Sequence, residues 1–323
     1  MYRRIGALII SLLLAFGILG AMLWRVWGDL TATLQYLNPL FLLPAVLICV
    51  IAWFARGWRY RVILARLTVM VPVVFSTGCI FLSQTVNLIV PARLGDLIRV
   101  ILIRHEYEAT VSQGISSIVV ERIFDIITVA LLGMVAVFFV LDVPDWILSL
   151  IALPLILGFV FFAGLLCMGG ISSENRYIGY LLTMLAEVRA ASLTPSTTAL
   201  LFVSSIAIWI MDTLICVAVS GMFSEQIPFA VILLGIVAGN LVKAVPLTPG
   251  GMGTYEITLA VIFELSGVAP VTATLIAVVD HLIKNLITLA GGAGSVLYFG
   301  NWVIPAMMAS IRRRLCSEST DES

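Results

Sequence analysis

Ionisable side chains stand inside the apolar runs of this sequence, where they are costly. A charged side chain at the centre of a membrane helix costs about 2.5–3.5 kcal/mol on insertion scales, so such residues usually face a polar cavity or an opposite charge. Two groups of them, at residues 121–125 and 280–285, are accompanied by single charges at Asp212, Lys243 and Glu256. These side chains can form ion pairs between helices, or they can bind a charged ligand.

A Pro/Gly-rich break, Lys243–Glu256, separates two apolar runs. Its prolines stop one helix, its glycines permit left-handed turns, and Thr254 can begin the next helix. Backbone that leaves helical geometry inside hydrocarbon has unpaired N–H and C=O groups, each of which is costly. We therefore expect the break to line a cavity, where the N–H groups that begin the next helix form a site for a phosphate or a carboxylate.

Cations stand beside such breaks and in the last apolar run. Arg93 and Lys243 are close to glycines, while His281 and Lys284 follow Asp280, with Asp280 and Lys284 spaced for an i, i+4 pair. Cations next to a glycine break and a helix N-terminus commonly bind anions. The favoured interpretation of Arg93, Lys243 and the pair His281 and Lys284 is that they bind an anionic head group.

The carboxylates have a structural interpretation. Glu121 and Asp125 lie one turn apart with Arg122 beside them, and for this group and for Asp212 ion pairing between helices is favoured. Glu256 leaves three interpretations open. It can stabilise the first turn of a helix through the dipole, carry a proton, or bind a substrate amine.

These residues and the backbone of the breaks form one candidate binding site. No metal or cofactor is predicted, because the two histidines are far apart and the five cysteines are scattered without metal-ligand spacing. No nucleophile stands beside a base, so no catalytic residue is predicted. The predicted substrate-binding residues are Asn87, Arg93, Asp96, Arg99, Glu121, Arg122, Asp125, Lys243, Pro249, Gly250, Gly251, Gly253, Glu256, Asp280, His281 and Lys284.

The composition is that of an integral membrane protein. Of 323 residues, 61% are hydrophobic and 11% are charged, and the mean hydropathy is +1.14. The 18 basic residues equal the 18 acidic residues in number, so no basic excess indicates nucleic acid as a partner. We predict a single all-α polytopic domain over residues 1–316 and a disordered tail over residues 317–323.

Apolar runs and arginines together predict six complete spans and two re-entrant hairpins. Ile5–Trp24 has no cleavage pattern and remains as the first span, and Pro39–Phe54 is followed by an arginine cluster at residues 56–66. The positive-inside rule places this cluster in a cytoplasmic loop and both termini in the cytoplasm, with the chain in the cell membrane. Further spans are predicted at Ile115–Leu141, Trp146–Met168, Thr198–Phe223 and Val271–Phe299, with a surface helix in Ser172–Thr197.

The predicted hairpins lie in segments 69–141 and 229–299 and enter the membrane from opposite sides. Each has a Pro/Gly break, then an acidic residue (Asp96 or Glu256), and then one long span with polar residues. The same order in opposite orientation is typical of the inverted repeats of alternating-access transporters.

Three motifs resemble one known family. They are NLIVPARLGDLIR at Asn87–Arg99, VERIFD at Val120–Asp125 and PGGMGTYE at Pro249–Glu256, in this order along the chain. By them the chain is similar to the flippase-like family that shares the transmembrane region of lysylphosphatidylglycerol synthase, the bacterial multiple peptide resistance factor, with relatives in archaeal dolichol-phosphate sugar assembly. The resemblance implies a polytopic domain with re-entrant helices that moves an anionic or aminoacylated lipid between leaflets.

The sequence departs from that family in two ways. Asp280 and His281 stand where the family commonly has an arginine after an aromatic residue, which introduces a group that titrates near neutrality. The soluble aminoacyl-transferase domain of the full synthase does not follow the membrane region here, so lysyl transfer is not expected.

A lipid flippase or scramblase is the leading hypothesis, with a membrane lipid head group as its ligand. No GxxxxGK[ST] motif indicates ATP binding, so uphill movement would need an ion gradient or a sink. An intramembrane transferase acting on a polyprenyl-phosphate lipid and a membrane partner of a separately encoded transferase are the alternatives. The sequence leaves open whether the chain forms a homodimer.

Overall fold

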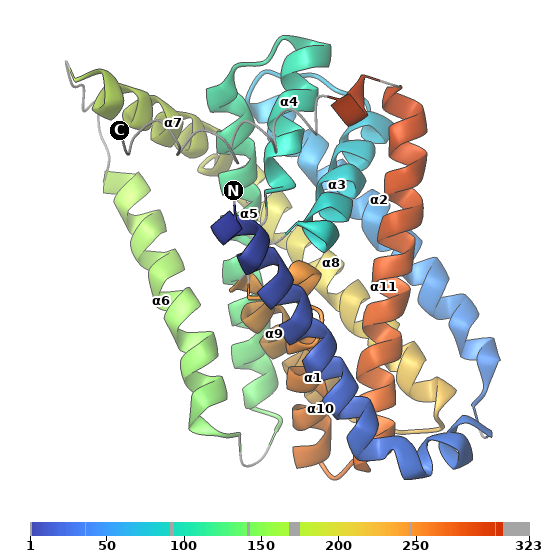
Figure 1. Ribbon diagram of the computed structural model, residues 1–323. Helices are drawn as coiled ribbons and strands as arrows, with labels where there is room; N and C mark the ends of the chain where they lie inside the picture. Colours follow the sequence, from blue (N-terminus) through green and yellow to red (C-terminus); the bar gives the residue numbers. More distant parts are fainter. Residues whose placement is uncertain are drawn as a thin grey trace.

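The structure, a computed structural model, is helical and contains no strand in the residues that it describes, which are 2–35, 37–90, 94–140, 143–167, 175–245, 247–300 and 302–305 (Figure 1). Short 3₁₀ turns lie at Pro39–Phe41 and Pro249–Gly251. The α-helices are α1 (Tyr2–Gln35), α2 (Leu42–Arg66), α3 (Val73–Ile89), α4 (Asp96–Tyr107), α5 (Val111–Val137), α6 (Asp145–Cys167), α7 (Arg176–Ser192), α8 (Pro195–Met222), α9 (Phe229–Ala244), α10 (Thr254–Leu265) and α11 (Pro270–Phe299).

Long apolar helices confirm the prediction of an all-α polytopic membrane protein. In the described part of the chain, five are long and apolar enough to cross a membrane: Ile10–Leu30, Pro39–Arg66, Asp145–Cys167, Pro195–Met222 and Pro270–Phe299. A sixth long helix, α5, has 27 residues but carries Glu121, Arg122 and Asp125 near its middle. The predicted span Ile115–Leu141 thus corresponds to the continuous helix α5, whose charged side chains need partners inside the protein.

Two helices are longer than the sequence pattern predicts. α1 continues to Gln35 instead of ending at Trp24, and α2 continues to Arg66 instead of ending at Phe54. No proline interrupts either extension, and most residues from 55 to 66 are good helix formers, so nothing in the sequence stops the helix. The prediction that the arginine cluster at 56–66 lies in a loop is therefore wrong, because the cluster belongs to α2.

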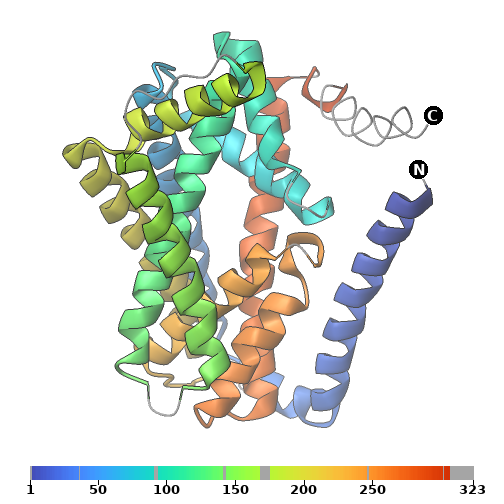
Figure 2. The same cartoon turned by 90° about the vertical axis from the view of Figure 1, so that its left-hand side faces the viewer.

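Two pairs of short helices enter the bundle from opposite ends. Figure 2 shows α3 and α4 coming from the upper end and α9 and α10 from the lower end, with their tips facing each other. The first pair has 17 and 12 residues and the second has 16 and 12, and each pair precedes a long helix, α5 or α11. The tips are in contact, because a Cβ atom at Gly250 would lie 2.5 Å from Cδ2 of Leu88.

Glycines form the tip of the second pair. Gly250, Gly251 and Gly253 have φ values of +61°, +78° and +83°, in the left-handed region that side-chain-bearing residues rarely adopt. The predicted left-handed turn is therefore present between α9 and α10.

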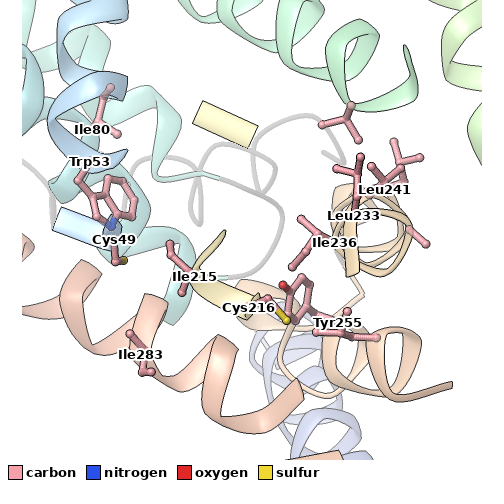
Figure 3. Close-up of a cluster of buried hydrophobic side chains, with 14 of the residues drawn as sticks. Cys49, Trp53, Ile80, Ile215, Cys216, Leu233, Ile236, Leu241, Tyr255 and Ile283 are labelled. Atoms are coloured by element: carbon pink, nitrogen blue, oxygen red, sulfur yellow. The ribbon is translucent and has the colours of Figure 1, made fainter. Parts of the chain in front are cut away.

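Apolar side chains fill the bundle around these hairpins. Figure 3 shows part of this core, in which Trp53 of α2 and Tyr255 of α10 lie on either side of Ile215 and Cys216 of α8. The described cysteines have free thiols, and Cys216 packs as a small apolar residue. This packing holds the long helices in place around a polar site.

Candidate functional site

A cavity of about 210 Å³ lies where the two hairpin tips meet. Helices α2, α5, α8 and α11 complete its wall. The predicted site residues that line it are Asn87, Glu121, Arg122, Asp125, Lys243, Gly250, Gly251, His281 and Lys284. Both hairpins and both of the long helices that follow them thus contribute to one site.

The remaining predicted residues have other positions. Gly253 faces α1, where its Cβ atom would lie 3.0 Å from Cβ of Ile18. Arg93 lies outside the described residues. Those that stand behind the cavity wall are Asp96, Arg99, Pro249, Gly253, Glu256 and Asp280.

Asp96 holds the tip of the first hairpin to α5. Its Oδ1 accepts hydrogen bonds from Ser83 at 2.9 Å and from Asn87 at 3.0 Å, and its Oδ2 accepts one from Arg122 at 2.9 Å. The Asn87 side-chain oxygen accepts from the Gly95 N–H at 2.8 Å, which closes the turn. Asp96 therefore fixes both the loop and the position of Arg122 at the cavity.

Arg99 makes a second link between the first hairpin and α5. It is fully buried, donates to Glu121 Oε2 at 2.6 Å, and lies with its guanidinium 5.1 Å from the ring centre of Tyr60. Glu121 thus reaches the cavity with its charge already paired, as the interpretation of ion pairs between helices predicts.

Two arginines of α2 reach the cavity, although sequence reasoning placed them in a loop. Arg59 donates to both carboxylate oxygens of Asp125, at 2.6 and 3.0 Å, and Arg56 donates to Asp212 at 2.8 Å. The signal that would have found them is charge balance. Asp125 and Asp212 stand in apolar runs and each needs a cation, and arginines three residues apart lie on one face of a helix.

Three residues, Lys284, Asp280 and Tyr255, form a polar group beside the tip of the second hairpin. Lys284 Nζ donates to Asp280 Oδ2 at 2.9 Å, which is the predicted i, i+4 pair, and to the Asp212 backbone oxygen at 3.3 Å. The hydroxyl of Tyr255 donates to the same Asp280 oxygen at 2.8 Å. Sequence reasoning missed Tyr255, whose only signal is its place directly before Glu256.

Glu256 lies in the first turn of α10 and caps the start of that helix. Its Oε2 accepts from the Gly253 N–H at 2.7 Å, so the helix's own carboxylate occupies one of the N–H groups predicted to bind a ligand. Its Oε1 lies 2.7 Å from His281 Nδ1, and His281 Nε2 lies 3.2 Å from Lys243 Nζ. These contacts connect the helix start with the cavity, because His281 and Lys243 line its wall.

Charges in the polar cluster balance, whereas those on the cavity wall do not. With His281 neutral, the described cluster holds equal numbers of cations and carboxylates: Arg56, Arg59, Arg99, Arg122, Lys243 and Lys284, against Asp96, Glu121, Asp125, Asp212, Glu256 and Asp280. Three of these carboxylates and one of the cations stand behind the wall, so cations exceed carboxylates on the surface of the cavity. Such a surface favours an anionic ligand.

The sequence matches known membrane proteins over most of its length. Residues 8–292 match the family described as the lysylphosphatidylglycerol synthase TM region. The chain is 30% identical to a protein called glycosyltransferase AglD from Haloferax volcanii, over 84% of this chain and 50% of that protein, so it spans half the length of that relative.

Two further relatives carry names that state only a membrane location. The chain is 22% identical to a UPF0104 membrane protein of Methanothermobacter thermautotrophicus, over 87% of this chain and 92% of that one. It is 27% identical to the UPF0104 membrane protein MJ1078 of Methanocaldococcus jannaschii, over 64% and 91%.

Proposed function

Since the chain belongs to the family of the lysylphosphatidylglycerol synthase transmembrane region, we propose that it is a flippase or scramblase that moves an anionic phospholipid, or a lipid linked to polyprenyl or dolichol phosphate, between membrane leaflets. The observation that carries this proposal is the excess of cations on a cavity where two opposed hairpins meet. A phosphate-bearing head group crosses hydrocarbon only at great cost. Cations inside a bundle compensate for its lost hydration when they pair with the phosphate.

The opposed hairpins supply the mechanism of this proposal. Both are re-entrant and are equivalent parts of an inverted repeat over segments 69–141 and 229–299. The head group enters the cavity from one leaflet while its acyl or prenyl chains stay in the bilayer, and a rearrangement of the tips opens the cavity to the other leaflet. Both termini lie on the cytoplasmic side of the cell membrane.

Lys243 and Lys284 are the proposed phosphate-binding residues of the second half of the site. Both line the cavity, and each ammonium group is a point charge that can approach a phosphate oxygen from many directions. Arg122 faces them from α5, held by Asp96. Arg93, three residues before the start of α4 in the sequence, completes the proposed set.

Reconstitution in liposomes tests this function. Fluorescent phosphatidylglycerol, a fluorescent polyprenyl phosphate and fluorescent phosphatidylcholine are each placed in one leaflet, and their appearance in the other is followed by reduction of the accessible label. We expect the two anionic probes to cross faster than in protein-free vesicles. Equal rates with and without protein, for every probe, would contradict the proposal.

An intramembrane transferase is the second candidate function, because one relative is named as a glycosyltransferase. Three carboxylates line the cavity and could act as bases: Glu121, Asp125 and Asp212. Each of them is paired with an arginine. Incubation of purified protein with a polyprenyl phosphate and sugar nucleotides separates the two functions. A new glycolipid product would favour the transferase. Capture of a separate transferase, with no lipid movement by the chain alone, would favour an anchoring role.

A further inference from the structure

His281 lies between a cation and an anion in the wall of the cavity. Its Nε2 is 3.2 Å from Lys243 Nζ, and its Nδ1 is 2.7 Å from Glu256 Oε1. His281 is 1% exposed, and its ring is tilted by 40° against that of Tyr255, with ring centres 4.6 Å apart. Burial, this ring contact and the two polar contacts hold the imidazole in one orientation.

These two contacts define the protonation state of the ring. A lysine ammonium group can only donate a hydrogen bond, so the Nε2 that faces it has a free lone pair. A carboxylate can only accept, so the Nδ1 that faces it carries the proton. His281 is therefore the neutral Nδ1–H form while Lys243 remains in place.

The two carboxylates nearest to His281 on α10 and α11 also have other hydrogen-bond donors. Glu256 also accepts from the Gly253 N–H, and Asp280 accepts from Lys284 and Tyr255. The titratable and charged groups that face His281 are Lys243 on α9, Tyr255 and Glu256 on α10, and Asp280 and Lys284 on its own helix, with Asp212 of α8 and Arg122 of α5 across the cavity. Among these, His281 is the group whose ordinary pKa is nearest to neutrality.

We propose that His281 is a proton-binding site that is filled when a monoanionic lipid head group binds at Lys243. The inference rests on the proposed function. A head group draws the Lys243 ammonium toward its phosphate and leaves the Nε2 lone pair without a donor. A proton from water then binds Nε2, and the same proton leaves when the head group does.

Charge balance is the driving force. Among the described residues, the polar cluster contains equal numbers of cations and carboxylates when His281 is neutral, so a phosphodiester adds one negative charge that this cluster does not balance, and a buried unbalanced charge is costly. Protonation of His281 restores the balance without breaking any of the ion pairs on α2, α5 or α11. The bound state holds one proton more than the free state, so affinity rises as pH falls.

Proton uptake can be measured directly on the purified full chain. Dihexanoyl phosphatidylglycerol is titrated into the protein in detergent by calorimetry, in buffers with different heats of ionisation, and the slope of binding heat against ionisation heat gives the protons taken up. We expect about one proton for each lipid bound, and up to about a tenfold loss of affinity for each pH unit of increase. Dihexanoyl phosphatidylcholine brings its own positive charge and is expected to bind without proton uptake.

The two histidines of the chain provide a matched pair of variants. His281→Asn keeps a donor toward Glu256 but has no titratable nitrogen, and we expect it to bind phosphatidylglycerol without proton uptake. His105→Asn changes a surface histidine that stacks on Trp302 and should keep the uptake of the wild type.

Binding without uptake by the wild type, or undiminished uptake by His281→Asn, would overturn the inference. Failure of every form to bind phosphatidylglycerol would instead contradict the proposed function, on which this inference rests. The wild-type measurement decides the matter even if His281→Asn does not fold.

Discussion

Arg59 shows how a single charge is accommodated inside this bundle. It is 2% exposed and donates to both oxygens of Asp125 and to Ser205 Oγ at 2.6 Å. Removing one partner of a buried pair leaves an uncompensated charge, whereas replacing both partners by apolar side chains often costs little. The pair thus contributes more to the arrangement of α2 and α5 than to net stability.

Arg59→Met is expected to lower the free energy of unfolding by about 3–5 kcal/mol, because Asp125, whose side chain is 14% exposed, then loses the cation that pairs with it. The double variant Arg59→Met with Asp125→Leu should recover most of that loss. Arg25→Met is the control, since Arg25 is exposed where it pairs with Glu264 at 2.9 Å, and its expected cost is about 0–1 kcal/mol. Denaturant unfolding in detergent measures all three. A double variant no more stable than Arg59→Met would refute this account of the pair.

Lys243→Gln is expected to weaken the binding of anionic lipid and leave the fold intact. A charge-assisted hydrogen bond is worth about 1.5–3 kcal/mol, which corresponds to a loss of affinity of about 10- to 100-fold. Lys284→Gln should also lower the melting temperature, because it removes the cation that faces buried Asp280. Lipid titration and thermal unfolding distinguish the two variants. Wild-type affinity in Lys243→Gln would remove Lys243 from the site.

At the scale of helices and loops, the sequence predicts most elements to within a few residues, and α2 is the informative exception. Apolar runs and Pro/Gly breaks are local signals, and they correctly separate α3 from α4 and α9 from α10. The end of α2 is not local, because Arg56 and Arg59 look solvent-exposed until Asp212 and Asp125 are brought to them by other helices. A rule that assigns arginine to loops fails where a partner is distant in sequence.

Gly251→Ala is expected to reduce lipid movement by displacing Lys243. A Cβ atom at this position would lie 2.5 Å from Lys243 Cγ, and the residue has a φ of +78°. Gly267→Ala is the matched control, since its φ is +93° and no atom lies within 4 Å of the added carbon. Both variants should lose about 1–2 kcal/mol of stability from the strained backbone, and only Gly251→Ala should slow the anionic probe. Equal transport rates in the two variants would contradict this role.

At the scale of the whole molecule, the site is made by parts of the chain that no short motif connects. Lys243, His281 and Lys284 were predicted because each is a charge in an apolar run, and the structure brings them to one cavity with Asn87 and Arg122. The sequence could not tell that Asp96, Arg99 and Asp280 stand behind that wall, because burial behind a neighbour depends on how helices rotate against each other. The charged residues in apolar runs predict that a polar site exists, whereas helix packing decides which of these residues line its cavity.

A disulfide between the hairpin tips is expected to stop lipid movement reversibly. A Cβ atom at Gly250 would lie 3.4 Å from the Leu88 Cα, so cysteine side chains at these two positions would be direct neighbours. Leu88→Cys with Gly250→Cys should be slow when oxidised and recover on reduction, while each single variant should be unaffected by the oxidant. Full transport by the oxidised double variant would show that the tips need not part.

The glycine turn between α9 and α10 has neighbours on three sides. Gly250 meets Leu88 of the first hairpin, Gly251 meets the stem of Lys243, and Gly253 meets Ala15 and Ile18 of α1. Because none of these contacts leaves room for an added carbon, the turn cannot shift without pushing on all three neighbours. A head group bound at Lys243, as proposed, would therefore displace residues that touch both the first hairpin and α1. In the proposed flippase, a movement of this turn would therefore be transmitted to α1 as well as to the first hairpin.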